Sequence, residues 1–216
     1  MRVLLLIVAA IVAYYLGSLN GAILTARFIY HKDVRDYGSG NAGLTNFYRN
    51  FGASGMAFVI LIDILKSVIA VLLGGALLGA VEAKMVGKLF AGFCLIMGHI
   101  FPAFYQFRGG KGVLCFMTMA FLVDWRAGLL CLLVFVLIVV FTRYVSLGSV
   151  IAALLCPLFL LMFGHDALSC VLALLCALLI VVKHAENIVR LISGTENKFS
   201  IVGRRPVQND DFDDVN

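Results

Sequence analysis

The sequence predicts an all-α, polytopic membrane protein with seven transmembrane helices, several of them short. Of its 216 residues, 62% are hydrophobic and 13% are charged, whereas an average soluble domain is about half apolar and about a quarter charged. Long apolar runs recur along the chain, and the mean hydropathy is +1.04. The runs are continuous and do not alternate as the strands of a membrane β-barrel do. A soluble enzyme, a secreted disulfide scaffold and a disordered chain are therefore excluded.

The expected spans follow the apolar runs in chain order. The first run, residues 3–30, is too long for the apolar region of a cleaved signal peptide, so we expect a retained helix. Six further spans are expected at residues 55–81, 85–107, 113–123, 127–142, 145–163 and 167–182. A spanning helix needs about 20 residues, with a range of about 17–25. Because several runs are shorter than this, 113–142 and 145–182 could instead each form one long helix, which gives five spans.

The basic residues favour seven spans with the N-terminus outside. This topology places twelve basic residues in inner segments, namely Arg27, Lys32, Arg35, Arg49, Arg108, Lys111, Arg143, Lys183, Arg190, Lys198, Arg204 and Arg205. It places four in outer segments, namely Arg2, Lys84, Lys88 and Arg126, and it leaves Lys66 within a span. This split obeys the positive-inside rule. Five spans would bury Asp124 and Arg126 in the membrane at high cost and would leave Arg143 outside.

The predicted topology places the C-terminus and the longer, more polar connections in the cytoplasm, so we expect function on that face. Residues 1–202 are expected to form a single integral-membrane domain. Residues 203–216 lack an apolar pattern and are expected to be a disordered tail. The six cysteines all lie in apolar runs, and none forms a Cys-x-x-Cys motif. We interpret them as small hydrophobic residues and predict neither a metal site nor a disulfide.

The first inner loop is rich in glycine and short polar residues. It reads Tyr37-Gly-Ser-Gly-Asn-Ala-Gly-Leu-Thr-Asn46 and is followed by Arg49. Glycines let backbone N–H groups converge on an anion, and the short polar side chains add donors. Arg49 could hold a phosphate through two hydrogen bonds. The alternative is a tight loop with a helix cap at Thr45 or Asn46.

The second inner loop reads Arg108-Gly-Gly-Lys-Gly112. It lacks the Gly-x-x-x-x-Gly-Lys-Ser/Thr pattern, so a nucleoside triphosphatase is excluded. A lysine among glycines at the start of a helix favours an anion, because backbone N–H groups and the helix dipole point to that position. The alternative is that the two basic residues only anchor the inner face.

Two further inner segments carry polar residues, Arg143-Tyr-Val-Ser146 and Lys183-His-Ala-Glu-Asn-Ile-Val-Arg190. His184 and Asn187 are spaced i, i+3 and are expected on one face of a helix. A histidine at a helix end is often a structural hydrogen-bonding residue. Here it is expected on the same membrane face as two candidate anion sites, so both interpretations stay open.

Two other patterns have structural and functional interpretations. Asp63 and Lys66 are spaced i, i+3 within a span, where charges are rare and paired, and mutual neutralisation is favoured over direct catalysis. His31 and Asp36 match the His-x4-Asp spacing of another class of glycerolipid acyltransferases. That class has a soluble domain, which is not visible in this sequence, so this match is the weaker hypothesis.

The sequence contains no nucleophile elbow, no paired carboxylates in the inner loops and no metal-ligand cluster. The candidate site is therefore expected to hold anions, with phosphate in the cytosol and an acyl chain in the bilayer. The alternative is a transporter or channel for a phosphorylated metabolite, which would also use anion-binding loops. A transporter should place polar residues along a path through the membrane. Apart from Asp63 and Lys66, the spans lack such residues.

Four segments together carry a family resemblance. They are Gly38-Ser-Gly-Asn-Ala-Gly-Leu-Thr-Asn46, Gly109-Gly-Lys-Gly-Val113, Tyr144-Val-Ser-Leu147, and Lys183-His-Ala-Glu-Asn187 with Gly194-Thr-Glu196. Their order and spacing over about residues 17–198 resemble the PlsY family of bacterial acyl-phosphate:glycerol-3-phosphate acyltransferases. Gly98-His-Ile-Phe-Pro102 also matches a family segment. The departures are Asn20, where proline is expected, and Leu114-Cys-Phe116, where smaller residues are expected.

The resemblance implies the first acylation step of phospholipid synthesis. The acyl group of a fatty acyl phosphate passes to the sn-1 hydroxyl of glycerol 3-phosphate, without a covalent acyl-enzyme and without a cofactor or metal. The products are lysophosphatidic acid and phosphate. The implied partners are the two substrates and membrane lipids, with no nucleic acid; the oligomeric state is open, a monomer included. The implied location is the bacterial cytoplasmic (inner) membrane, multi-pass, with the active site facing the cytoplasm.

Matching positions imply the site residues. Catalytic roles fall on Lys111, Ser146, His184 and Asn187. Phosphate binding falls on Ser39, Gly40, Asn41, Thr45, Arg49, Gly110, Lys111 and Gly112. The resemblance leaves open whether His184 or a substrate phosphate takes the proton. Because an acyl phosphate is already activated, good positioning could supply much of the rate, roughly 7–11 kcal/mol.

Overall fold

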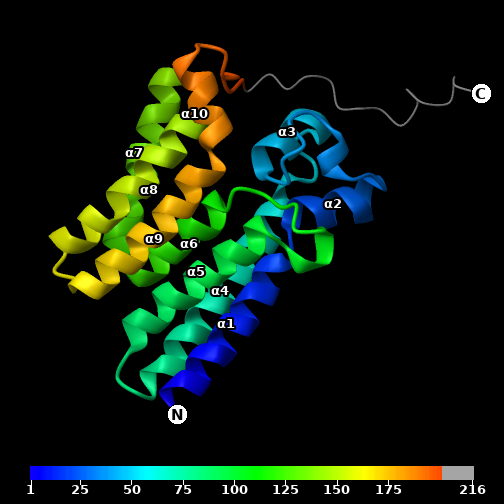
Figure 1. Ribbon diagram of the computed structural model, residues 1–216. Coiled ribbons are helices and arrows are strands. Elements are labelled where there is room, and N and C mark those ends of the chain that lie inside the picture. The colour runs from blue at the N-terminus through cyan, green and yellow to red at the C-terminus, as the bar shows by residue number, and fades with distance from the viewer. Residues whose placement is uncertain (201–216) are drawn as a thin grey trace, which may run out of the picture.

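The computed structural model describes residues 1–200, and all regular structure in that range is helical (Figure 1). The elements are α1 (Arg2–Ser18), α2 (Gly21–Tyr30), η1 (Val34–Asp36), α3 (Leu44–Phe51), α4 (Met56–Gly79), α5 (Lys84–Ile100), η2 (Ala103–Tyr105), α6 (Val113–Val123), α7 (Trp125–Thr142), α8 (Val145–Met162), α9 (Ala167–Lys183) and α10 (Ala185–Ile192). The η elements are short 3-10 helices. The all-α prediction is confirmed. The tail predicted at 203–216 lies outside the described residues.

The apolar run over residues 3–30 forms one candidate span, Arg2–Tyr30, as expected, but its helix is interrupted. The chain breaks at Leu19 and Asn20, and α2 leaves the line of α1 to lie beside α3 (Figure 1). Asn20 starts the new helix, because its side-chain oxygen accepts a hydrogen bond from the Ile23 N–H at 3.0 Å. The side chain of Asn20 thus caps the start of α2 within a largely apolar run. The helix expected over 85–107 also ends early, at Ile100, two residues before Pro102.

Five helical stretches of the described residues are long and apolar enough to cross a membrane, and α9 with α10 makes a sixth if the two form one bent span. The α6 helix has only 11 residues. The membrane character of the chain is therefore clear. The count of seven spans and the outside location of the N-terminus stay predictions.

The chain turns back at residues 124 and 166, where the five-span alternative required continuous long helices. At both positions an aspartate caps the start of the next helix. The Asp124 carboxylate accepts from the Arg126 N–H at 2.9 Å and begins α7. The Asp166 carboxylate accepts from the Ser169 N–H at 3.0 Å and begins α9. Gly164, with φ of +81°, lets the chain turn between α8 and α9. The helix pairs α6–α7 and α8–α9 then pack side by side, so neither pair forms one long helix.

The loops gather at two ends of the bundle. The connections that follow α2 and α5 are hydrogen-bonded to each other, and the segment after α10 is bonded to the connection after α7. Lys111 of the connection after α5 is bonded to α10, and this end is called the site end. At the opposite end, Arg2 donates to the Val81 carbonyl at 3.3 Å, and His165 lies 2.9 Å from Asp124. The loops that carry Lys111, Arg143 and Lys183 are thus all at the site end, as the predicted topology requires.

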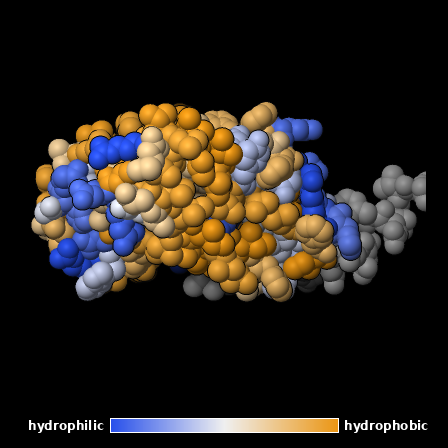
Figure 2. Space-filling view, turned by 90° about the horizontal axis from the view of Figure 1, so that it is seen from below, coloured by the Kyte–Doolittle hydropathy of each residue, from blue (hydrophilic) through white to orange (hydrophobic). Residues whose placement is uncertain are grey.

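Small residues let the helices pack closely. A Cβ atom at Gly17 would collide with the Leu95 carbonyl of α5, and one at Gly98 would collide with the Tyr14 carbonyl of α1. Close contact between backbones is typical of helices in membranes, where lipid gives no hydrophobic drive for their association. Large apolar side chains instead face outward along α4 and α7, and Figure 2 shows a broad hydrophobic surface between hydrophilic groups near both ends of the view.

Candidate active site

The side chain of Lys111 lies at the centre of the site end. It leaves the glycine loop just before α6, where Gly112 has a φ of +79° and allows the tight turn. Its ammonium donates a hydrogen bond to the Asn187 side-chain oxygen of α10. Burial lowers the pKa of Lys111 to about 8, although the nearby Glu196 carboxylate opposes the shift. The ammonium is therefore still the main form at neutral pH.

A carboxylate, Glu196, joins the predicted catalytic residues. One of its oxygens accepts from the Ser146 hydroxyl at 2.7 Å and from the Asn187 amide at 2.6 Å. The other oxygen accepts from Arg190 Nε at 2.8 Å. Burial opposes ionisation, but these three hydrogen bonds hold the pKa of Glu196 below its usual range. Glu196 is therefore an ionised acceptor that positions residues from α8 and α10.

His184 lies at a bend of 61° between α9 and α10, not within one continuous helix. Its Nδ1 atom is 2.7 Å from the Ile180 carbonyl. A carbonyl can only accept, so Nδ1 carries the hydrogen and Nε2 of the neutral ring keeps a lone pair. Burial first, and then the nearby Lys111 ammonium, lower the pKa of His184 to about 4. At neutral pH the ring is neutral and able to accept a proton.

The first inner loop is organised by Asn46. Its amide nitrogen donates to the carbonyls of Val34 at 3.1 Å and Tyr37 at 3.0 Å, and its oxygen accepts from the Ser39 N–H at 3.1 Å. The alternative in which Thr45 or Asn46 caps α3 is wrong, because the cap position is Gly43. Asn46 instead fixes the loop from within the helix.

The two glycine-rich loops touch each other. A Cβ atom at Gly110 would meet both the Ala42 carbonyl and the ring of His99. The Asn20 side chain donates to that same Ala42 carbonyl at 3.0 Å. Gly110 is therefore required for the close contact between the loops. The loop of Ser39, Gly40 and Asn41, which leads into Thr45 of α3, adjoins the loop of Gly110, Lys111 and Gly112.

The predicted residues differ in how directly they meet. Asn187 contacts Lys111, and Glu196 links Asn187 to Ser146, with His184 beside them. Among the described residues, no hydrogen bond connects Ser39, Asn41 or Thr45 with the Lys111 side chain. These loop residues lie at the same end but on the other side of Gly110.

The segment after α10 closes the site end. Arg49 of α3 donates to the Asn197 carbonyl at 3.3 Å. The Phe199 N–H donates to the Arg143 carbonyl at 2.7 Å, and the Phe199 ring lies 5.9 Å from the ring of Tyr48. This segment therefore connects α3 with the start of α8, and Arg49 reaches the site through it.

Two minor predictions have different outcomes. Asp63 and Lys66 form the expected ion pair, with Nζ and Oδ1 2.7 Å apart. His31 and Asp36 are both exposed, and His31 ends α2 in a left-handed conformation. The exposed pair lies outside the buried cluster around Glu196.

Sequence reasoning missed Glu196 and Arg190 as site residues. Glu196 belongs to the Gly194–Glu196 motif, and its spacing of six residues from Arg190 allowed an ion pair across a turn. The contact between the His99 ring and Gly110 was also missed, although His99 lies in the Gly98–Pro102 segment. The signal in the sequence was a carboxylate close to several basic residues. The sequence does not show that this carboxylate also contacts Ser146, 50 residues earlier.

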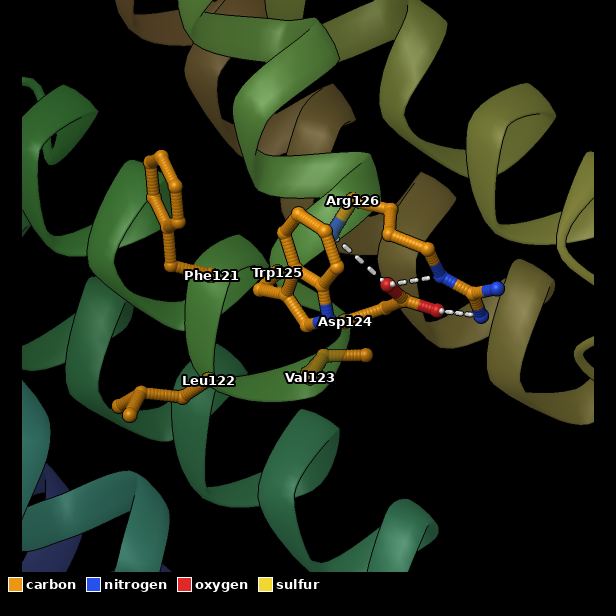
Figure 3. Close-up of a pocket in the computed structure, with 6 residues that line it drawn as sticks. All are labelled: Phe121, Leu122, Val123, Asp124, Trp125 and Arg126. Carbon is orange, nitrogen blue, oxygen red and sulfur yellow. Dashed lines mark hydrogen bonds and ion pairs between the residues drawn. The ribbon is translucent and has the colours of Figure 1, made fainter.

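The opposite end holds a second polar cluster. The Asp124 carboxylate accepts from Arg126 Nε at 3.1 Å and from its Nη2 at 2.7 Å (Figure 3), and it lies 2.9 Å from His165. Residues 121–126 also line a cleft of about 400 Å³. This cleft contains none of the predicted site residues and lies far from the cluster around Glu196.

Comparison with known proteins confirms the family resemblance found in the sequence. A family model described as glycerol-3-phosphate acyltransferase matches residues 7–194. A glycerol-3-phosphate acyltransferase of Clostridioides difficile (strain 630) is 40% identical over 200 residues, which cover 92% of this chain and 97% of that protein. A protein of the same name from Thermoanaerobacter sp. (strain X514) is 38% identical over 192 residues, with 89% and 94% covered.

Solved structures agree. A crystal structure of PlsY (YgiH), an integral membrane glycerol 3-phosphate acyltransferase in its glycerol 3-phosphate form, is 33% identical with a TM-score of 0.82. The match covers 90% of this chain and 96% of that one. The lysophosphatidic acid form of the same protein gives a TM-score of 0.79 at 32% identity. The chain therefore belongs to the glycerol-3-phosphate acyltransferase family and is an integral membrane enzyme of the PlsY type.

Proposed function

We propose that this enzyme uses a fatty acyl phosphate as its donor and acylates the sn-1 hydroxyl of glycerol 3-phosphate. The family assignment rests on the comparisons above. The donor, the acceptor position and the residue roles are inferred from the site. The observation that carries the proposal is the buried cluster in which Lys111, Ser146, His184 and Asn187 meet around Glu196 beside two glycine-rich loops.

The two phosphates would be held by the glycine-rich loops and the cations beside them. Lys111 follows Gly110 and precedes the N-terminus of α6, where backbone N–H groups and the helix dipole favour an anion. The loop of Ser39, Gly40 and Asn41 adjoins it, and Thr45 and Arg49 of α3 would supply further donors, with Gly112 at the start of α6. Both family structures named above were solved with phosphate-bearing molecules, glycerol 3-phosphate and lysophosphatidic acid.

The reaction would proceed in one step between the bound substrates. The sn-1 oxygen attacks the acyl carbonyl carbon, and the bond between that carbon and the phosphate oxygen breaks. The Nε2 lone pair of His184 takes the hydroxyl proton, and inorganic phosphate leaves with the electron pair. Lys111 stabilises the charge that grows on the leaving phosphate, an effect typically worth about 10²–10³-fold in rate for one donor.

Ser146 is a poor candidate for an acyl-enzyme. Its hydroxyl donates to Glu196, a carboxylate whose pKa is held below its usual range. The same carboxylate also accepts hydrogen bonds from Asn187 and Arg190, so it holds the serine in place and is not free to take its proton. We assign Ser146 and Asn187 to orienting the acceptor. Incubation with acyl phosphate alone tests this assignment, since an acyl adduct in the intact mass of the protein would contradict it.

The decisive experiment supplies purified enzyme with glycerol 3-phosphate and a synthetic acyl phosphate. We expect stoichiometric release of phosphate and formation of 1-acyl lysophosphatidic acid, also in the presence of a metal chelator. Acyl-CoA in place of acyl phosphate should give no product. Robust acylation from acyl-CoA would overturn the donor assignment, and a 2-acyl product would overturn the proposed position of the acceptor.

The His-x4-Asp alternative makes the opposite prediction for one variant. If His31 were the base, His31→Ala would abolish activity and His184→Ala would not. We expect His31→Ala to retain activity within about twofold of the parent, because its side chain is exposed. The transporter alternative is set aside, because the chain belongs to an enzyme family.

We also propose that the site end faces the cytoplasm of a bacterial inner membrane. The basic inner loops support this orientation through the positive-inside rule. The test is a single cysteine at the exposed Arg143, in a background in which the six native cysteines are replaced by alanine. Labelling of intact cells by a membrane-impermeant reagent would reverse the orientation. Labelling only after the cells are opened is the expected result.

A further inference from the structure

Three ionisable residues are buried together within the bundle, away from the cluster around Glu196. Asp63 and Lys66 come from α4 and His99 comes from α5, and each is at most 4% exposed. Lys66 Nζ is 2.7 Å from Asp63 Oδ1 and 2.9 Å from His99 Nδ1. Charges in a membrane bundle are costly, and they usually mark a function.

This buried cluster holds the break between α1 and α2. Lys66 donates to the carbonyls of Gly17 at 3.1 Å and Leu19 at 2.7 Å, where α1 ends. Asp63 accepts from the Gly21 N–H at 3.2 Å, where α2 begins. A helix break leaves backbone groups without partners, and within a membrane no water replaces them. The ion pair satisfies these groups and fixes the position of Asn20 between them.

Asn20 and His99 connect the buried cluster to the two glycine-rich loops. Asn20 donates to the carbonyl of Ala42 in the first loop at 3.0 Å. His99 accepts through its backbone carbonyl from the Gly110 N–H at 3.1 Å, and its ring leaves no room for a Cβ atom at Gly110. A hydrogen on His99 Nδ1 would point at the Lys66 ammonium 2.9 Å away, so the proton of the neutral ring lies on Nε2. Nε2 is the ring atom that a Cβ atom at Gly110 would meet most closely.

We propose that Asp63, Lys66 and His99 form a positioning cluster for glycerol 3-phosphate, which sets the distance between the two glycine-rich loops. The proposal rests on the assignment of these loops to phosphate binding. A small displacement of either loop would weaken the binding of glycerol 3-phosphate, since hydrogen bonds to its phosphate need donor–acceptor distances of about 2.7–3.2 Å. Stability alone gives a weaker reason for the ion pair, because replacing a buried pair by uncharged side chains is often neutral or stabilising.

A metal ion is a poorer interpretation of the same residues. Ligand atoms of Asp63, His99 and Cys115 lie within 4.8 Å of one another. The Lys66 ammonium already lies within hydrogen-bonding distance of two of the three. A second cation there would face direct repulsion.

The test compares neutralised ion pairs at the two ends. The double variant Asp63→Asn/Lys66→Met removes both charges together, so no unpaired charge stays buried. Asp124→Asn/Arg126→Met makes the same change at the opposite end and is the matched control. For each purified variant, the KM for glycerol 3-phosphate, kcat and the melting temperature are measured. The assay uses whichever acyl donor the parent accepts, so failure of the acyl phosphate proposal would not affect this comparison.

We expect Asp63→Asn/Lys66→Met to fold and to raise the KM for glycerol 3-phosphate about tenfold, with kcat changed less than about threefold. The control should leave KM within twofold of the parent. A purely structural ion pair would change the melting temperature and leave the KM of the folded enzyme unchanged. A KM within twofold of the parent for the folded double variant would overturn the proposal, and so would an equal rise in the control.

If the double variant does not fold, His99 decides the question. His99→Gln can place an amide where Nε2 faces Gly110, and His99→Asn can place an acceptor where Nδ1 meets Lys66. We expect the KM for glycerol 3-phosphate to rise in both, because neither bridges Lys66 and Gly110 at once. Parent-like KM values in both folded variants would overturn the proposal.

Discussion

The carboxylates of Glu196 and Asp124 lie in similar surroundings at opposite ends of the bundle. Each accepts hydrogen bonds from an arginine and from at least one other residue distant in sequence. The difference lies in what stands beside them. Asp124 binds Arg126, two residues away, and His165. This cluster joins the turn between α6 and α7 to the turn between α8 and α9. Glu196 has the Lys111 ammonium and the His184 ring beside it.

The comparison teaches that a polar cluster alone does not identify a site. The Lys111 ammonium has three hydrogens, and among the described residues Asn187 is the one hydrogen-bond acceptor seen for it. His184 donates a hydrogen bond from Nδ1 to the backbone carbonyl of Ile180, and its Nε2 atom keeps a lone pair. The cluster at Glu196 can therefore bind an anion and take a proton. The partners of Asp124 are already used in joining helices.

The largest expected effect is that of His184→Ala. Loss of the base should lower kcat about 10³-fold, within the range of about 10²–10⁴ typical of general base catalysis. His165→Ala removes a histidine from the opposite cluster and should leave kcat within twofold of the parent. Initial rates of phosphate release measure both. An equal loss of kcat in His184→Ala and His165→Ala would contradict the assignment of catalysis to the site end.

Lys111→Ala should lower kcat/KM about 10²-fold while the protein stays folded, because one charged donor to phosphate is lost. Arg126→Ala removes a cation from the opposite cluster and should leave kcat/KM unchanged. Size-exclusion profiles in detergent show whether both variants are folded. A near-normal rate for folded Lys111→Ala would exclude Lys111 from phosphate binding.

The pH dependence should separate the two site residues. His184 must be neutral and Lys111 protonated, and their pKa values are about 4 and about 8. We expect kcat/KM of the parent to be level between these values, to fall above about pH 8 as Lys111 loses its proton, and to fall near pH 4 as His184 gains one. Lys111→Arg should keep its charge and move the alkaline fall upward. An unchanged alkaline fall in that variant would assign it to another group.

The smallest effect on activity is expected for Asp124→Asn, which should act on stability. Arg126 first, and then His165, lower the pKa of Asp124. A lowered pKa stabilises the folded state above the unfolded value of about 3.9, and this contribution disappears as the pH falls below it. At pH 7 we expect a melting temperature about 2–4 °C lower, from a loss of about 1 kcal/mol.

Thermal unfolding at pH 7 and near pH 3 measures this stability effect. The difference between the parent and Asp124→Asn should shrink at the lower pH. The rate of acyl transfer at pH 7 should stay within twofold of the parent. A large loss of activity without a loss of stability would contradict the structural interpretation of the opposite end.

The apolar helices could be predicted closely, because hydrophobic runs and their polar breaks are local. The run at 113–123 coincides with α6, and the run at 145–163 exceeds α8 by one residue. The break at Asn20 could not be predicted in this way. It depends on carbonyl and N–H groups that find partners in Lys66 and Asp63, more than 40 residues later.

The candidate site could be proposed from the sequence as a set of residue types but not as an arrangement. Glycine-rich loops and lysine at a helix start indicated anion binding at Lys111. The contact between Glu196 and Ser146 spans 50 residues and depends on how α10 packs against α8. The bend at His184 also depends on this packing. Long-range contacts of this kind leave no pattern in a single sequence.

The position of Glu196 after α10 has a consequence for biosynthesis. Ser146 and Asn187 acquire their shared hydrogen-bond acceptor only after residue 196 has been synthesised. A nascent chain with all its apolar helices already in the membrane still has an unfinished site. Chain segments generally fold as they are synthesised, so the early helices assemble first. A chain that stops before residue 196 would therefore hold its apolar helices but lack the carboxylate that orients Ser146 and Asn187.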